Sequence, residues 1–257
     1  MSAAVAEKPA ETAKVKAPKK ELFDLSSIAK ISPPRTATDK FSMVLYGGKG
    51  YGKTHLLGSI QDVEALAPLL ILATEDGTSV LADKYPDVDV IAIEDWKMAA
   101  PIISAVAEGN TKYKTVAIDT LPELQELMKA HSTNNGRTPM EFKDWGFIAD
   151  ETIKVVKMLH RSPVNVIFTS HVEKVKDEST GKLLASPYFL GKKSLIEVLK
   201  PVDLVCYLGI GKGEDGESLR VLQTKPDGKF DASDRTGKLD EYIPDPDFSK
   251  IYAQLTA

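Results

Sequence analysis

Short apolar runs alternate with amphipathic segments through most of the chain. Each run has the length and near-continuous hydrophobicity of a strand that is buried on both faces, as in a parallel sheet. The predicted strands are FSMVLYG (41–47), LLILATE (69–75), VDVIAIE (88–94), KTVAIDT (114–120) and VNVIFTSH (164–171).

Segments with helical spacing separate these strands. Helices are predicted from Lys53 to about Ile60, near 97–108, over 121–131 and over about 141–160. Parallel strands need crossover connections of this kind. The pattern therefore predicts an α/β fold, with a mostly parallel twisted sheet covered by helices on both faces.

The C-terminal part has a different pattern of apolar and polar residues. The runs DLVCYLGI (203–210) and SLRVLQT (218–224) flank the turn-rich segment GKGEDGE, which predicts an antiparallel hairpin. A short helix is expected over FSKIYAQL (248–255), whereas 172–200 is a polar, lysine-containing stretch with few regular signals.

The N-terminal region differs from the rest in composition. Residues 1–37 are predicted to be a disordered basic tail and linker, with a short helix over 21–31, and residues 38–257 to form one domain. The first twenty residues carry five lysines against two glutamates and have little apolar surface to bury. Because the whole chain has a net charge of −4, the remainder is acidic, and a strongly basic nucleic-acid-binding domain is not indicated.

Cysteine content and hydropathy bear on the cellular compartment of the protein. Cys206 is the single cysteine, so it cannot form an internal disulfide, and we expect a buried thiol in a reducing compartment. No apolar run approaches the roughly 20 residues that span a bilayer. The N-terminus also lacks the apolar segment of a secretory signal. We therefore expect a cytoplasmic protein that does not act at a membrane.

The segment GGKGYGKT (47–54) fits the phosphate-loop pattern G-x-x-x-x-G-K-[ST], and it lies between a predicted strand and a predicted helix. Glycines let successive backbone N–H groups turn toward phosphate oxygens. Lys53 is expected to reach the β- and γ-phosphates, and the Thr54 hydroxyl to ligate Mg²⁺. The predicted nucleotide-binding residues are Gly47, Gly48, Lys49, Gly50, Tyr51, Gly52, Lys53, Thr54 and His55. The chain is predicted to bind a nucleoside triphosphate.

Acidic residues at the ends of two other strands supply candidates for hydrolysis. Asp119 is the predicted second contact to Mg²⁺, the alternative being a cap for the next helix. Many strand-rich ATPases place the catalytic glutamate directly after this aspartate, but Thr120 stands there. Glu75, at the end of an earlier strand, is therefore the predicted catalytic base, with Asp76 and Glu123 as further candidates. A solvated strand end is the other interpretation of Glu75 and Asp76.

One histidine ends a core strand at the edge where ligands bind in such sheets. His171 is a candidate sensor that hydrogen-bonds the γ-phosphate, the alternative being a surface histidine. The other histidines, His55, His131 and His160, lack metal-ligand spacing, so no metal other than Mg²⁺ is indicated.

These motifs resemble the RecA-type ATPase core, and specifically the phage-encoded, single-domain RecA-like proteins of the Sak-type single-strand annealing group. The resemblance covers about residues 40–245. It rests on YGGKGYGKTHLL, ILATEDGTSVL, VAIDT, VIFTSHV and FDASDRTGKLDE. It implies that residues 38–257 form a RecA-like ATPase domain that uses ATP and Mg²⁺ on single-stranded DNA, in the host cytoplasm if the protein is phage-encoded.

The resemblance also implies partners and further site residues. The partners are a single-strand binding protein and other copies of the chain in a ring or filament. A DNA-binding loop is implied within 172–200, where the residues available to contact DNA are Lys174, Lys176, Lys182, Lys192 and Lys193, with Tyr188 or Phe189 for stacking. The acids Glu173, Asp177 and Glu178 favour a solvated loop instead.

A basic residue acting on a neighbouring subunit's site is implied as well. Arg235 leads these candidates, with Lys225 and Lys229 behind it. The chain departs from the bacterial recombinase in having His171 in place of glutamine and in lacking a separate C-terminal DNA-binding domain. Both differences weaken the case for strand exchange more than the case for ATP hydrolysis.

The function that we expect is DNA-stimulated ATP hydrolysis in recombination or single-strand annealing. A ring helicase or a replication-loader ATPase is the main alternative. A phosphate-loop kinase of a small molecule is a further one, although the chain has no arginine-rich segment to close over an acceptor. A nucleotide switch that does not hydrolyse ATP is the last.

Overall fold

The computed structural model describes residues 27–28, 40–176, 181, 183–213 and 215–257. The chain divides into two units, Met1–Arg35 and Thr36–Ala257, and the helices and strands named below lie in the second. The predicted tail over 1–37, with its expected helix over 21–31, lies outside the described residues except for Ser27 and Ile28.

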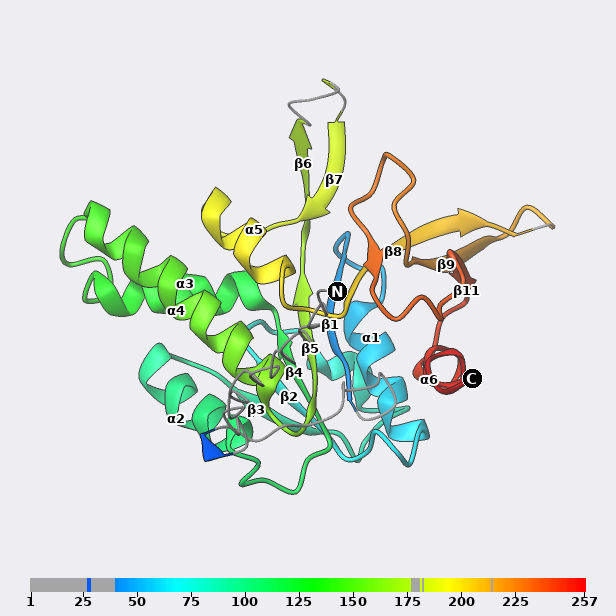
Figure 1. Cartoon of the computed structure of the whole chain (residues 1–257), viewed down its shortest axis with the longest axis horizontal. Helices are drawn as coiled ribbons and strands as arrows, with labels where there is room; N and C mark the ends of the chain where they lie inside the picture. Colours follow the sequence, from blue (N-terminus) through cyan, green and yellow to red (C-terminus); the bar gives the residue numbers. More distant parts are fainter. Residues whose placement is uncertain (1–26, 29–39, 177–180, 182, 214) are drawn as a thin grey trace, which may run out of the picture. The chain divides into compact units, whose positions relative to one another are not determined.

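A nine-stranded sheet forms the centre of the second unit (Figure 1). Its strands lie in the order β11-β9-β8-β1-β5-β4-β2-β3, and β10 pairs with β8. The part from β8 to β3 is parallel, whereas β9, β10 and β11 are antiparallel to their neighbours. The bounds are β1 (Ser42–Gly47), β2 (Leu69–Ala73), β3 (Asp89–Ala92), β4 (Thr115–Asp119), β5 (Asn165–Ser170), β8 (Leu204–Lys212), β9 (Ser218–Gln223), β10 (Ser233–Asp234) and β11 (Tyr242–Pro244). The predicted α/β class, the five predicted strands and the C-terminal hairpin are confirmed. Strand β3 lies at the end of the sheet and alternates half-buried with exposed residues, so the expectation that it is buried on both faces is wrong.

Helices cover both faces of the sheet, because successive residues of a strand point to opposite sides. In β1, Met43 and Leu45 belong to one buried cluster, while Val44 and Tyr46 belong to the other. The first cluster lies under α1 (Lys53–Gly58), the short helices η2 (Ser59–Asp62) and η3 (Thr78–Leu81), and α6 (Phe248–Thr256). The second lies under α2 (Trp96–Ala107), α3 (Leu121–Ser132), α4 (Phe142–Arg161) and α5 (Lys192–Leu199).

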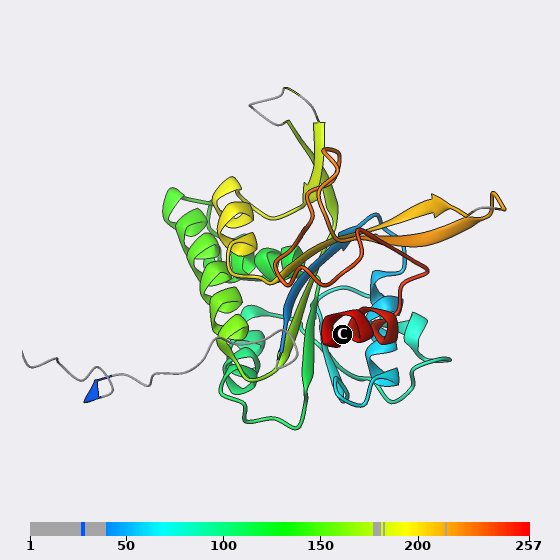
Figure 2. The same cartoon turned by 45° about the vertical axis from the view of Figure 1, so that its right-hand side comes forward.

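The prediction of few regular elements over 172–200 is wrong. Strands β6 (Val172–Lys176) and β7 (Leu183–Pro187) pair as a separate antiparallel sheet, and α5 follows. Figures 1 and 2 show this hairpin projecting beyond the main sheet. Lysines on β6 and the shortness of α5 weaken the periodic signal that identifies longer elements. Within the part of the chain that the structure describes, no helix is long and apolar enough to cross a membrane.

The order of the strands brings the candidate site residues to one edge of the sheet. Strand β5 lies between β1 and β4, and β2 lies on the far side of β4. Because these strands are parallel, their carboxyl ends meet at one edge, where ligands bind in open α/β sheets. The phosphate loop after β1, Asp119 at the end of β4, Glu75 after β2 and His171 after β5 therefore share this edge.

Candidate nucleotide-binding and hydrolysis site

The phosphate loop has a backbone that only glycine adopts without strain. Gly50 and Gly52 have φ values of 80° and 90°, in the left-handed region that disfavours side chains. A Cβ atom on Gly47 would lie 2.3 Å from the Leu208 carbonyl oxygen of β8. The sequence GGKGYGKT therefore builds a tight turn against β8 and ends it at the first residue of α1.

Lys53 folds back over the loop. Its Nζ donates to the carbonyl oxygens of Gly47 at 3.0 Å and Gly48 at 3.3 Å. Burial lowers the pKa of the Lys53 ammonium, and the carboxylates of Asp119 and Glu75 act in the opposite direction. The ammonium is thus held over the concave side of the loop by weak carbonyl acceptors, which phosphate oxygens can replace with stronger charge-assisted hydrogen bonds.

Thr54 and Asp119 are in direct contact. The Thr54 hydroxyl donates to Asp119 Oδ2 at 2.8 Å, and the Thr169 hydroxyl donates to the other carboxylate oxygen. These are hard oxygen ligands of the type that Mg²⁺ prefers, and a Mg²⁺ bound through one or two protein oxygens takes its other ligands from phosphates and water. Among the described residues, no group of three or more His, Cys, Asp or Glu side chains could hold a metal by itself. Thr54 and Asp119 therefore fit a Mg²⁺ that arrives with a nucleotide.

Glu75 lies beside this pair, at the end of the neighbouring strand. The Thr120 hydroxyl donates to Glu75 Oε1 at 2.8 Å, and His171 Nε2 lies 2.9 Å from the same oxygen. Thr74 is bonded to the backbone of Asp119 and Thr120, which fixes the end of β2 against the end of β4. The Glu75 carboxylate is thus oriented by two side chains while about a third of it remains open to solvent.

The other acidic candidates occupy different environments. Burial raises the pKa of the Glu123 carboxyl, and the nearby charges of Glu75 and Glu126 raise it further. Asp76 is exposed, directly after Glu75. The structure therefore places Glu123 within electrostatic reach of the site and directs Asp76 to solvent.

His171 joins this site to the β6–β7 hairpin. Its carbonyl oxygen accepts from the backbone N–H of Tyr188 at 2.9 Å, and the Ser170 hydroxyl donates to the Tyr188 carbonyl oxygen at 2.7 Å. His171 directly precedes β6, and Tyr188 directly follows β7. A movement of His171 can therefore pass directly to both ends of the hairpin.

The comparisons with known proteins identify the family. A family model described as an AAA domain (AAA_24) matches residues 39–236. The chain belongs to this AAA domain family. No curated protein matches it. Taken with the sheet order and the phosphate loop, the family identifies a P-loop ATPase domain with a RecA-like α/β fold.

Several solved structures are similar to this AAA domain. A KaiC-like protein of the archaeon Pyrococcus horikoshii is 16% identical over 71% of this chain and 78% of its own, with a TM-score of 0.40. The flagellar accessory protein FlaH of Methanocaldococcus jannaschii is 9% identical over 79% and 84%, with a TM-score of 0.42. An ATPase of the type III secretion system of pathogenic bacteria is 17% identical over 66% and 51%, with a TM-score of 0.43. Values this low do not define a shared function.

Arg235 lies near the amino ends of the parallel strands, opposite the edge that carries the nucleotide site. It follows β10, which pairs with Leu204 and Val205 at the start of β8, and its guanidinium donates to the Lys200 carbonyl oxygen. The phosphate loop lies at the end of β1, and a six-residue strand spans about 20 Å. Arg235 is therefore not brought to the nucleotide site of its own chain, and its predicted role concerns a neighbouring subunit.

The lysines predicted within 172–200 have different surroundings. Lys174 and Lys176 are exposed on β6, whereas Lys193 forms an ion pair with Asp150 at 2.8 Å. Lys182 lies outside the described residues, and the side chain of Lys192 is also outside them. Phe189 is only 3% exposed and belongs to the core, so the prediction that it stacks on bases is wrong.

A groove that the sequence did not reveal adjoins the hairpin. It encloses about 850 Å³ and lies among β6, α5 and the first turns of α4. Trp145, 46% exposed, and Tyr188, 37% exposed, contribute its aromatic surface. The residues that line it are Trp145, Glu173, Lys174, Lys176, Tyr188, Phe189, Leu190, Gly191, Leu195 and Ile196. Trp145 was missed because it comes from a helix distant in sequence from 172–200.

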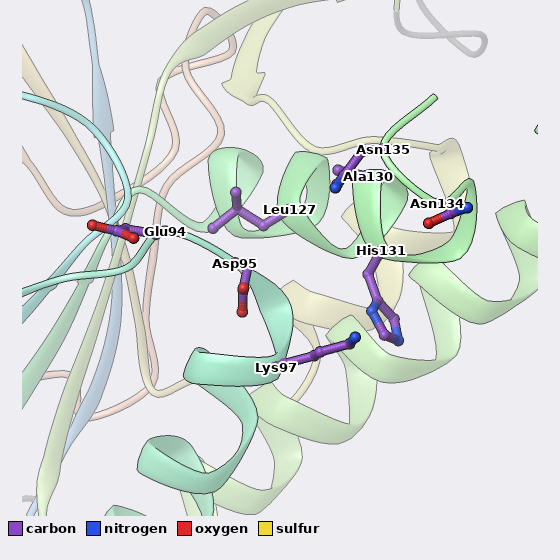
Figure 3. A pocket seen from close by; sticks show the side chains of 8 residues that line it. All are labelled: Glu94, Asp95, Lys97, Leu127, Ala130, His131, Asn134 and Asn135. Carbon is purple, nitrogen blue, oxygen red and sulfur yellow. The ribbon is translucent and has the colours of Figure 1, made fainter. Parts of the chain in front are cut away.

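A smaller polar pocket of about 180 Å³ lies between the start of α2 and the end of α3 (Figure 3). Its lining includes Glu94, Asp95, Lys97 and His131. Asp95 already serves as the cap of α2, since its carboxylate accepts from the Met98 N–H at 2.8 Å. The pocket contains none of the phosphate-loop residues, so it is separate from the nucleotide site.

Proposed function

We propose that the protein is a Mg-ATP-dependent ATPase that acts on single-stranded DNA in recombination or strand annealing, as its resemblance to the Sak-type group implies. The observation that carries the proposal is the hydrogen bond between Glu75 and His171. It connects a carboxylate at the nucleotide site to the residue that precedes the β6–β7 hairpin, beside the groove that Lys174, Lys176, Trp145 and Tyr188 line.

The nucleotide side follows from the residues around the phosphate loop. The loop N–H groups and Lys53 would hold the phosphates, while Thr54 and Asp119 would hold Mg²⁺, which when bound neutralises phosphate charge. Glu75 would orient a water and accept its proton as the water oxygen bonds to the γ-phosphorus. The bond from that phosphorus to the bridging oxygen breaks, which gives ADP and phosphate. Thr120, whose hydroxyl donates to Glu75, would hold the carboxylate in place for this step.

The DNA side follows from the groove beside the hairpin. Proteins that bind single strands combine basic side chains for the phosphates with aromatic rings on which bases stack. Lys174 and Lys176 supply the positive charge, and Trp145 and Tyr188 supply exposed rings in the same groove. Glu173 also lines the groove, and burial raises the pKa of its carboxyl.

The connection between the two sites supports coupling. His171 contacts Glu75 through its ring and Tyr188 through its backbone. When a γ-phosphate arrives, we expect His171 to exchange Glu75 for a phosphate oxygen and to shift the base of the hairpin. DNA bound in the groove would act on the same histidine in reverse, and so stimulate hydrolysis.

The test is ATP turnover by the full chain with and without single-stranded DNA. We expect single-stranded DNA to raise the rate of ATP turnover at least severalfold. We expect Lys53→Ala to abolish turnover with and without DNA. Turnover that is robust but indifferent to every DNA and RNA would contradict the DNA-dependent part of the proposal. Translocation along tailed duplexes would favour the helicase alternative instead.

Other copies of the chain are part of the proposal. A ring or filament would bring the Arg235 edge of one subunit toward the nucleotide edge of the next. Mixing Arg235→Ala subunits with Lys53→Ala subunits tests this, because a residue that acts on the neighbour lets some mixed interfaces recover turnover. Two inactive variants that stay inactive when mixed would contradict a trans role. A single-strand binding protein remains a proposed partner.

A further inference from the structure

Arg220 lies against the phosphate loop although it is far from it in sequence. It projects from β9 with Nη1 3.3 Å from His55 Nδ1 and Nη2 3.2 Å from Asp245 Oδ1. A Cβ atom built on Gly52 would lie only 3.2 Å from Nη1. The guanidinium thus covers the Gly52–His55 side of the loop, and the missing side chain at Gly52 leaves space for it.

The contact with His55 has a defined direction. A guanidinium has no acceptor, so Arg220 donates and His55 Nδ1 accepts. His55 also packs edge-on against Tyr85 with ring centroids 5.6 Å apart. A ring held in this way supports Arg220 on one side.

The positive charge at this position is incompletely balanced. Asp245 is the carboxylate that pairs with Arg220, and its side chain is 71% exposed, so the pair is weakened by solvent. An anion bound beside Gly52 and His55 would give Arg220 a second, less exposed counter-charge.

The phosphate loop gives the direction in which the nucleotide lies. Lys53 and Thr54 face the β- and γ-phosphates and the metal, next to Asp119 and Glu75. Arg220 is on the side of Gly52 and His55, where it contacts His55 and Asp245. Because Lys53 and Thr54 serve the β- and γ-phosphates, we expect the α-phosphate and the nucleoside to lie on the side of Arg220.

We propose that Arg220 binds the α-phosphate end of the nucleotide, the part that ATP and ADP share, and that His55 orients its guanidinium. This inference rests on the nucleotide binding in the proposed function. Arg220 is then a binding residue with no role in sensing the γ-phosphate, in contrast to the role proposed for His171.

Calorimetric titration of the full chain with Mg-ADP and with a Mg-bound non-hydrolysable ATP analogue tests the inference. We expect Arg220→Ala to weaken both by the same factor, about tenfold, because a charge-assisted contact common to both ligands is lost. Arg220→Lys keeps the charge without the planar fork and should weaken both about threefold. His55→Ala should have a smaller effect of the same kind. Arg161→Ala, at the exposed end of α4, is the matched control and should bind as the wild type does.

The outcomes separate this inference from the function on which it rests. Unchanged binding of both ligands by Arg220→Ala, or a loss confined to the ATP analogue, would overturn the role of Arg220 and leave the ATPase proposal standing. A wild-type chain that binds neither ligand would overturn both. Thermal unfolding of each variant checks the fold, and if Arg220→Ala unfolds early, Arg220→Lys decides by the same comparison of ADP with the analogue.

Discussion

The nucleotide site and the groove at the β6–β7 hairpin lie at one edge of the same sheet, yet they are built differently. The nucleotide site has buried and half-buried groups that already contact one another, as Thr54 contacts Asp119. The groove has exposed side chains on separate elements, as Trp145 is on α4 and Lys174 is on β6. Phosphate geometry is the same for every nucleotide, so it requires a fixed site, whereas a flexible single strand can bind to dispersed rings and charges.

The two regions should therefore respond to different substitutions. Changes at the nucleotide site should remove turnover and leave the free groove intact. Changes in the groove should weaken DNA binding and leave DNA-independent turnover intact. His171 contacts both the nucleotide site and the base of the hairpin. A substitution of His171 should therefore affect turnover and DNA binding together.

The largest effect is expected for Lys53→Ala. Turnover should fall below detection, because the ammonium over the phosphate loop is the main positive charge available to the β- and γ-phosphates. DNA binding without nucleotide should not change, which fluorescence anisotropy of a labelled single strand measures. Lys157→Ala, exposed on α4, is the control for loss of a lysine. Equal loss of DNA binding in Lys53→Ala would mean that the two regions are not separate.

Glu75→Gln should reduce turnover by about 10² to 10⁴, the range for loss of a general base. The amide keeps the shape and can still contact Thr120, so binding of ATP should persist in a filter-binding assay. The matched control is Asp76→Asn, which changes the neighbouring exposed carboxylate. If Asp76→Asn lost turnover and Glu75→Gln kept it, the assignment of the base would be reversed.

Trp145→Ala should weaken single-stranded DNA binding by about five- to a hundredfold, because base–aromatic stacking contributes about 1–3 kcal/mol per base. Turnover without DNA should not change. Phe142→Ala is the control, since this ring is 93% exposed on the same helix but does not line the groove. Equal effects of the two substitutions on anisotropy titrations would show that the groove has no specific part in binding.

Glu123→Gln should give the smallest effect, a modest gain in thermal stability near pH 7. The pKa of Glu123 is higher in the folded protein than its ordinary value of 4.5. The free energy of unfolding of the wild type therefore falls as the pH rises from 4.5 through the folded-state pKa. The gain from glutamine should therefore be full above that window and absent below pH 4.5. Melting temperatures of the two proteins from pH 4 to 8 check this, and a gain that is constant with pH would contradict the cause.

The sequence by itself determined the elements that depend on neighbours in the chain. The phosphate loop is eight consecutive residues whose glycines, lysine and threonine are all required locally. The buried strands were equally visible, because a strand covered on both faces is apolar at nearly every position. Asp119 and Glu75 could be proposed because each ends such a strand.

Only the tertiary structure decided which of these residues meet. Glu75 and His171 are 96 residues apart, and their contact depends on β2 and β5 lying on either side of β4. Thr169, Thr120 and Arg220 are ordinary polar residues in the sequence, and they acquire their contacts only from the sheet order and from the hairpin that carries β9. The same reason explains Trp145 and the mistaken Phe189: a side chain's exposure depends on what packs against it, and local periodicity records that only when an element is long and regular.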